Sequence, residues 1–161
     1  MVDSKLEGFK MSDNIQDMYK KARKAFREIE FETQERVDEI CAAVGWELQK
    51  EDTAKELAHL AVSESGIGVY EDKVHKVQNK TRGMMRDMIG KKTCGLVRED
   101  KEKGLRIYAQ PMGVIANVVP CTNPESTVCC IGVSLLKTRN AMICSPHPRT
   151  AKATFATVEH I

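Results

Sequence analysis

The sequence feature that most constrains the fold is a nearly continuous apolar run from Gly113 to Val119, followed directly by a short polar turn and a helical pattern. Runs of this kind are typical of parallel strands whose two faces are both covered. A second short apolar stretch, Ala141 to Cys144, follows the predicted helix. Strand, helix and strand at these lengths predict a βαβ unit with a right-handed crossover. The chain is therefore expected to belong to the α/β class.

The polar turn leads into a helix that Asn123 can cap and Pro124 can begin, because a missing N–H costs nothing at the first helical position. This helix is expected to end near Lys137. Beyond the second strand, Pro146-His147-Pro148 breaks the chain before a last helix that starts near Thr150.

Apolar residues recur at helical spacing through the first half of the chain. The methionines near residue 85 fall on the same stripe as neighbouring valines, so we interpret them as core. The turn-like, charged stretch 99–104 separates segments 93–98 and 105–110, and apolar and polar residues alternate in the second of them, which predicts a β-hairpin with one face in water. Four helices are predicted before the hairpin. The first spans residues 14 to 30 with a cap at Asp13, and the second is capped by Thr33. The third begins with a capping box of Thr53 and Glu56 and ends near Gly66, and the fourth runs from about Glu71 to Ile89.

Composition and charge exclude several classes of protein. Lys and Arg number 25 against 23 Asp and Glu, a net charge of +2 with the signs interspersed, so a nucleic-acid partner is not expected. No signal-like segment and no apolar stretch of membrane-spanning length occurs, which predicts a cytoplasmic protein without a membrane partner. The six cysteines include no C-x-x-C pair, so we interpret them as reduced, apolar side chains and expect no metal.

Two parallel strands cannot cover their own faces, and each buried aliphatic side chain contributes only roughly 1.5–3 kcal/mol against an ordering cost of roughly 1–2 kcal/mol per residue. We therefore expect the natural protein to continue, or other chains to supply the missing partners. An isolated monomer of these 161 residues should lack a single cooperative unfolding transition in a denaturant titration. Full cooperative unfolding would contradict this expectation.

The turn Pro120-Cys121-Thr122-Asn123-Pro124 is the candidate site, because ligands of open α/β sheets bind beyond the carboxyl ends of strands. Thr122 and Asn123 are equally well explained as a turn residue and a helix cap. Cys121 could be a nucleophile beside a helix N-terminus, but a structural thiol is the favoured interpretation. His147 is as consistent with a loop as with a contact. No G-x-G-x-x-G follows the strand, so any dinucleotide must be held differently.

The stretch Gln110 to Thr154 closely resembles the start of the nucleotide-binding domain of CoA-acylating aldehyde dehydrogenases. This group includes acylating succinate-semialdehyde dehydrogenase and the aldehyde half of bifunctional aldehyde–alcohol dehydrogenases. The motifs P-x-T-N-P and S-P-H-P-R carry the resemblance at the correct separation, and the phrase from Gly68 to Val74 and Lys91-Lys92-Thr93 are also similar. The resemblance extends from about residue 13 to the end.

The resemblance implies the N-terminal part of an enzyme that joins a small-molecule aldehyde to coenzyme A, with NAD or NADP accepting the hydride. Its nucleophilic cysteine would lie beyond residue 161. Thr122 or Asn123 would stabilise the oxyanion, or both would line the nicotinamide. The implied cofactor-binding residues are Pro120, Cys121, Thr122, Asn123, Ser145, Pro146, His147 and Arg149, with Ser145, His147 and Arg149 as ribose candidates and Arg149 also as a phosphate candidate.

The resemblance also implies a domain organisation and a homo-oligomer. Residues 1–12 would be a flexible extension, 13–90 a helical region, 91–111 an oligomerisation hairpin and 112–161 the start of an incomplete Rossmann-like NAD(P)-binding domain. Two alternatives stay open at this point. One is a non-catalytic assembly module derived from the family, and the other is a hydrolytic aldehyde dehydrogenase.

Overall fold

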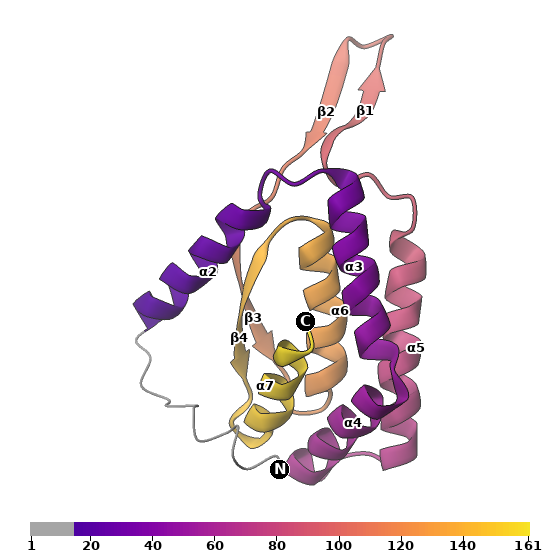
Figure 1. Cartoon of the computed structure of the whole chain (residues 1–161), viewed down its shortest axis with the longest axis vertical. Helices are drawn as coiled ribbons and strands as arrows, with labels where there is room; N and C mark the ends of the chain where they lie inside the picture. The colour runs from indigo at the N-terminus through magenta and orange to yellow at the C-terminus, as the bar shows by residue number, and fades with distance from the viewer. Residues whose placement is uncertain (1–14) are drawn as a thin grey trace.

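Helices carry the first half of the described chain, and a hairpin and a pair of parallel strands follow (Figure 1). The computed structural model describes residues 15–161, so the expected extension 1–12 and the cap at Asp13 lie outside the described residues. The predicted α/β class, with helices and a hairpin before a βαβ unit, is confirmed. In chain order the elements are α2 (Ile15–Ile29), α3 (Gln34–Gln49), α4 (Glu51–Ser65), α5 (Tyr70–Met88), β1 (Gly95–Asp100), β2 (Leu105–Ala109), β3 (Val114–Val119), α6 (Pro124–Lys137), β4 (Ala141–Pro146), the 3-10 turn η1 (Pro148–Thr150) and α7 (Ala151–Glu159).

The two strands β3 and β4 form a parallel sheet and are joined by α6. Their register runs from Val114 opposite Ala141 to Val119 opposite Pro146. The sheet lies between α2 and α6, while α3 and α5 pack against α6 from the other side (Figure 1). Both strands therefore end at one edge, beside the start of α6.

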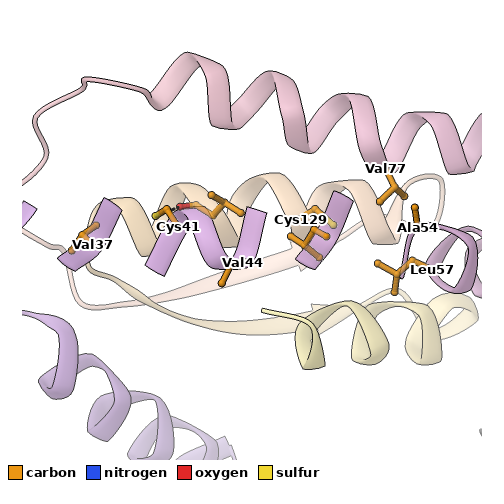
Figure 2. Close-up of a cluster of buried hydrophobic side chains, with 9 residues drawn as sticks. Val37, Cys41, Val44, Ala54, Leu57, Val77 and Cys129 are labelled. Carbon is orange, nitrogen blue, oxygen red and sulfur yellow. Dashed lines mark hydrogen bonds between the residues drawn. The ribbon is translucent and has the colours of Figure 1, made fainter. Parts of the chain in front are cut away.

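The hydrophobic core lies where α3, α4, α5 and α6 meet (Figure 2). The methionine stripe of α5 is half-buried, and Met85 and Met88 pack against this core, as predicted. Burial raises the pKa of the Cys41 thiol to about 11 and that of Cys129 to about 12, so both stay protonated and act as small apolar groups. All six cysteines are free. The fully or almost fully buried members are Val37, Cys41, Val44, Leu48, Ala54, Leu57, Val77, Cys129 and Val133.

A buried arginine just after α6 fastens three distant segments to one another. Arg139 has a left-handed backbone (φ 59°), and its side chain is 7% exposed. The guanidinium donates to the carbonyl oxygens of Glu30 (2.7 Å), Ala109 (3.2 Å) and Thr93 (3.5 Å). These are the end of α2 and the two roots of the hairpin, so a single side chain holds the hairpin against the body of the molecule.

The structure bears out one of two predicted helix starts, at Thr33, and contradicts the other, at Thr53. The Thr33 cap is confirmed, because its hydroxyl accepts from the Arg36 N–H at 3.2 Å. The capping box at Thr53 is wrong: α4 already begins at Glu51, and the Thr53 hydroxyl donates to Glu47 at 3.0 Å. The physical reason is that one extended residue between α3 and α4 breaks the helix, and two acidic residues then favour the new N-terminus.

The hairpin has no dry face in the described chain, so the prediction of one wet face is wrong. β1 and β2 pair in antiparallel fashion and extend away from the helices (Figure 1). Large apolar side chains on both strands are exposed, including Leu96, Leu105, Ile107 and Tyr108. Alternation in the sequence marks two faces, but nothing among residues 15–161 packs over either of them.

The predicted burial of the first strand on both faces is also wrong. Asn117 and Val119 in β3 are 5% and 2% exposed, whereas Val118 between them is 80% exposed. The described helices leave one face of β3 open because α2 lies mainly along β4.

Within residues 15–161, no helix is both long and apolar enough to cross a membrane.

A charged contact fixes the C-terminal end of α6 against α3. The Lys137 side chain is 5% exposed and forms an ion pair with Asp38. Gln34 also donates to Asp38, at 2.9 Å. Partial desolvation raises the pKa of Asp38, but the hydrogen bonds from Lys137 and Gln34 outweigh it and hold the pKa below its ordinary 3.8.

We predict that acid selectively weakens this contact. The folded-state pKa of Asp38 is below its unfolded value, so the pair stabilises fully above about pH 4 and is lost as the pH falls through the lowered folded value. In thermal unfolding of the intact protein, the difference in Tm between wild type and Asp38→Asn should shrink from about pH 6 to about pH 2. Asp17→Asn, which removes an exposed ion pair with Lys20, is the matched control. A gap that does not change with pH would contradict the prediction.

Candidate functional site

The parallel register brings the two predicted site segments to the same edge of the sheet. Val119 lies opposite Pro146, and the His147 N–H donates to the Val119 carbonyl at 3.1 Å. Residues 120–123 and 145–149 therefore follow adjacent strand ends. Among the predicted site residues, Pro120, Thr122, Ser145, His147 and Arg149 are exposed, and Cys121, Asn123 and Pro146 are half-buried.

The side chain of Asn123 does not cap α6. The residue occupies the N-cap position and Pro124 begins the helix as predicted, but no cap hydrogen bond forms from the amide. Instead, its Oδ1 accepts from Lys76 Nζ, and its Nδ2 donates to Thr122 Oγ1 at 3.3 Å. The prediction that the Asn123 side chain serves only to cap the helix is therefore wrong.

A buried ion pair lies directly beneath this turn. Lys73 Nζ in α5 contacts Glu125 Oε1 in α6 at 3.3 Å, and the two side chains are 6% and 0% exposed. The same ammonium donates to the Thr122 carbonyl oxygen at 2.6 Å, and Ser126 Oγ donates to the carboxylate at 3.1 Å. Glu125 Oε2 is buried and has no hydrogen-bond partner among residues 15–161. The backbone of the turn is thus held by the buried ammonium group of Lys73.

The approach of Lys73 to the turn depends on Gly68. This glycine has φ +90°, a conformation that favours glycine, and a Cβ there would lie 3.1 Å from Lys73 Cε. A side chain at position 68 would strain the backbone and crowd the lysine stem.

Sequence reasoning did not identify Lys73, Lys76 or Glu125 as site residues. Lys73 falls inside the phrase Gly68 to Val74 that carries part of the family resemblance, and Lys76 lies on the same helical face three residues later. Charged residues on an amphipathic helix are usually solvated, so spacing alone gives no signal for contacts across 47 to 52 residues.

Part of the second predicted site segment, residues 145–149, stabilises the fold. Arg149 Nη2 donates to the Ser65 carbonyl at the end of α4, and the Arg149 N–H donates to His147 Nδ1 at 3.2 Å. The N-terminus of α7 is filled by Glu64, whose carboxylate accepts from the Ala153 N–H at 2.8 Å. The Ser145 hydroxyl is exposed at the strand end.

These residues suit the ribose of a dinucleotide better than its pyrophosphate. Ser145 and His147 present polar groups at the edge of the sheet, as ribose hydroxyls require. The first turn of α6, where an anion would gain from the helix dipole, carries the acidic residue Glu125, whose carboxylate pairs with Lys73. Neither a glycine-rich loop nor a free basic side chain replaces this carboxylate at the start of α6.

Cys121 is half-buried within the turn, and no imidazole in the described part of the chain forms a hydrogen bond with it. His160, by comparison, lies 3.4 Å from Glu47 and 3.5 Å from Glu56, on another part of the surface. Residues 15–161 contain no group of three side chains arranged to hold a metal ion.

Comparison with known proteins gives concordant matches. The family model described as "Aldehyde dehydrogenase family" matches residues 10–161. The chain is 40% identical over 145 residues to a sulfoacetaldehyde dehydrogenase from Acholeplasma sp, covering 90% of this chain and 30% of that protein. It is 38% identical over 146 residues to a succinate-semialdehyde dehydrogenase (acetylating) from Clostridium kluyveri, covering 91% and 32%.

A solved structure of an acetylating aldehyde dehydrogenase from Geobacillus thermoglucosidasius superposes with a TM-score of 0.87 at 33% identity. The match covers 91% of this chain and 32% of that one. The chain therefore spans about a third of the length of these relatives.

We predict that the buried ion pair is a major determinant of stability. Lys73→Met leaves the Glu125 carboxylate buried without a countercharge, which should lower the free energy of unfolding by about 3–5 kcal/mol. Adding Glu125→Gln should recover part of the loss, because no buried charge then remains. Chemical denaturation of the intact protein measures both effects. Lys55→Met, which removes an exposed pair with Glu51, is the control, and an equal loss in that variant would sink the prediction.

Proposed function

Because the chain belongs to the aldehyde dehydrogenase family, we propose that it supplies the N-terminal part of an NAD(P)-dependent enzyme that converts an aldehyde and coenzyme A into an acyl-CoA. The names of the Clostridium kluyveri and Geobacillus thermoglucosidasius relatives, both acetylating, support the acyl-transfer chemistry. The share of those proteins that the chain covers supports a role as one section of the enzyme, inactive by itself.

The observation that carries the proposal is the turn at the carboxyl edge of the β3–β4 sheet. Its backbone is held by the buried Lys73, and its polar side chains, Thr122 and Asn123, remain at the surface of the described chain. Fixed donors at such a position can stabilise negative charge that develops on a substrate oxygen. One donor of this kind is often worth about 2.7–4 kcal/mol in the transition state.

In the proposed reaction, a cysteine thiolate from another part of the enzyme adds to the aldehyde carbon. A C–S bond forms and the carbonyl electron pair moves to oxygen, where Thr122 and Asn123 would donate. The oxyanion would then collapse to a thioester as a hydride leaves the same carbon, and a bound NAD(P)+, whose ribose Ser145 and His147 would hold, would supply the hydride acceptor. The deprotonated thiol of coenzyme A then attacks the thioester carbon, and the enzyme thiolate departs, regenerated.

The cysteines of this chain support a nucleophile from elsewhere. Burial raises the pKa of Cys41 and Cys129 far above neutrality, and it also raises the pKa of Cys130 and Cys144. Thiols that stay protonated are poor nucleophiles. The Cys121 thiol, in the turn, forms no hydrogen bond with a basic side chain of residues 15–161.

Three further parts of the proposal concern organisation. The helical region would end at residue 90, the hairpin 91–111 would contact other subunits of a cytoplasmic homo-oligomer, and residues 112–161 would begin the NAD(P)-binding domain. The exposed apolar side chains of the hairpin support its contact role. The cofactor ribose would meet Ser145 and His147.

We predict CoA-dependent oxidation of a short aldehyde by the intact protein. Sulfoacetaldehyde, succinate semialdehyde and acetaldehyde are assayed with NAD+ or NADP+, following NAD(P)H by absorbance and acyl-CoA by mass spectrometry. Without coenzyme A, NAD(P)H should stop near one equivalent per active site, because the thioester is not released. Sustained turnover that ignores coenzyme A would exclude the acylating reaction and favour a hydrolytic enzyme.

A further inference from the structure

The geometry points to Lys76 as a positioning residue that fixes which way the Asn123 amide faces, so that the turn presents donors and no acceptor to a substrate oxyanion. This inference rests on the proposed function. It concerns a residue of α5 that lies outside the turn and would not touch the substrate.

The Lys76 ammonium and the Asn123 amide differ in the hydrogen-bonding groups that they carry. An amide side chain has an oxygen that accepts and a nitrogen that donates, and rotation by half a turn exchanges them. An ammonium group carries three donors and no acceptor. Because Lys76 Nζ contacts the amide of Asn123, the oxygen must face the lysine. The nitrogen is then directed away from α5, toward Thr122.

The orientation of the amide determines what Thr122 can offer. Asn123 Nδ2 donates to Thr122 Oγ1 at 3.3 Å, so the hydroxyl oxygen is an acceptor in this contact. Within residues 15–161 the hydroxyl hydrogen has no acceptor, and the residue is exposed. The free side-chain donors of Thr122 and Asn123 are therefore the Thr122 O–H and the second hydrogen of Asn123 Nδ2. A chain from ammonium to amide to hydroxyl also polarises each successive donor.

A flipped amide would reverse this arrangement. Its oxygen would accept from the Thr122 hydroxyl, consuming the free hydrogen, and would place partial negative charge where an oxyanion must form. Lys76 prevents this state by leaving the amide nitrogen no acceptor on the α5 side. The proposed roles of both turn residues thus depend on one lysine.

The neighbouring lysine has a separable task. Lys73 holds the backbone of the turn through the Thr122 carbonyl and is paired with the buried Glu125. Lys76 is half-buried and contacts a neutral side chain, so its removal strands no buried charge. Loss of Lys76 should therefore change the chemistry of the site more than the stability of the fold.

Three substitutions in the intact protein separate donation from size and charge. Lys76→Arg keeps donors only, Lys76→Gln offers both a donor and an acceptor, and Lys76→Met offers neither. The readout is the single-turnover rate of NAD(P)H formation without coenzyme A, which isolates the oxyanion-forming half of the reaction. Lys80→Met, an exposed lysine one turn further along α5, is the control.

We expect Lys76→Met and Lys76→Gln to slow this rate by roughly 10-fold, less than the roughly 100-fold or greater loss from deleting a donor outright. Lys76→Arg should recover the rate to within about 3-fold of wild type, because it restores donor-only chemistry. The affinity for NAD(P)+ should not change in any of the three. An unchanged rate in Lys76→Met, or no recovery in Lys76→Arg, would overturn the inference and leave the proposed function standing.

A measurement that needs no activity tests the contact itself. In a double-mutant cycle of Lys76→Met and Asn123→Ala, the two shifts in Tm should be non-additive, because each variant removes the same hydrogen bond. Additive shifts would overturn the inference. If the wild-type protein forms no NAD(P)H from any aldehyde, the proposed function fails, and the cycle still decides whether Lys76 orients Asn123.

Discussion

The buried contact between Lys73 and Glu125 is the constraint on which the arrangement of the candidate site depends. Removing two charges from water costs several kcal/mol for each, and their attraction offsets this only where hydrogen bonds satisfy the remaining atoms. Here the ammonium also donates to a main-chain carbonyl, and one carboxylate oxygen accepts from Ser126 in the first turn of α6, while the other, Oε2, has no hydrogen-bond partner among residues 15–161. The pair can form in one register of α5 against α6, so it specifies the position of the turn between β3 and α6.

The opposite end of α6 is pinned by a second group of polar contacts. Lys137 pairs with Asp38 of α3, and Arg139 reaches the hairpin and the end of α2. Asn140 Oδ1 accepts from the backbone of Gly113 at 2.9 Å, which fixes the residue just before β3. Polar contacts at both ends therefore determine where α6 lies along its axis, while apolar packing with α3, α4 and α5 determines how closely it approaches them.

The sequence predicted elements well and interactions poorly. Helical spacing predicted α2 to α5 and α6 because apolar residues recur along one face of each helix, a property of neighbours in the chain. The helices α3 to α6 bury that face, whereas Phe26 is the one buried residue of α2. The capping box at Thr53 failed because a single-residue link between α3 and α4 overrode a local motif. The open face of β3 shows the limit of an apolar run as a signal. The run indicates which side chains a strand can bury, but their burial depends on the elements that pack beside the strand.

The same contrast applies to the candidate site. The turn was predicted from its place after a buried strand, and the register of β3 and β4 accounts for its proximity to residues 145–149. The three charged residues beneath and beside it were missed, because a lysine on an amphipathic helix looks the same in sequence whether it meets water or a carbonyl 49 residues away. Only the packing of α5 against α6 distinguishes the two.

The hydrogen bonds by which Arg139 holds the hairpin have a consequence for which residues can change in evolution. Arg139 contacts main-chain oxygens of Glu30 and Ala109, and every amino acid carries that oxygen. Descendant sequences are thus free to change these two positions without weakening the joint. Arg139 itself must be retained. Lysine carries one nitrogen in place of a planar guanidinium and cannot donate to three carbonyl oxygens at once.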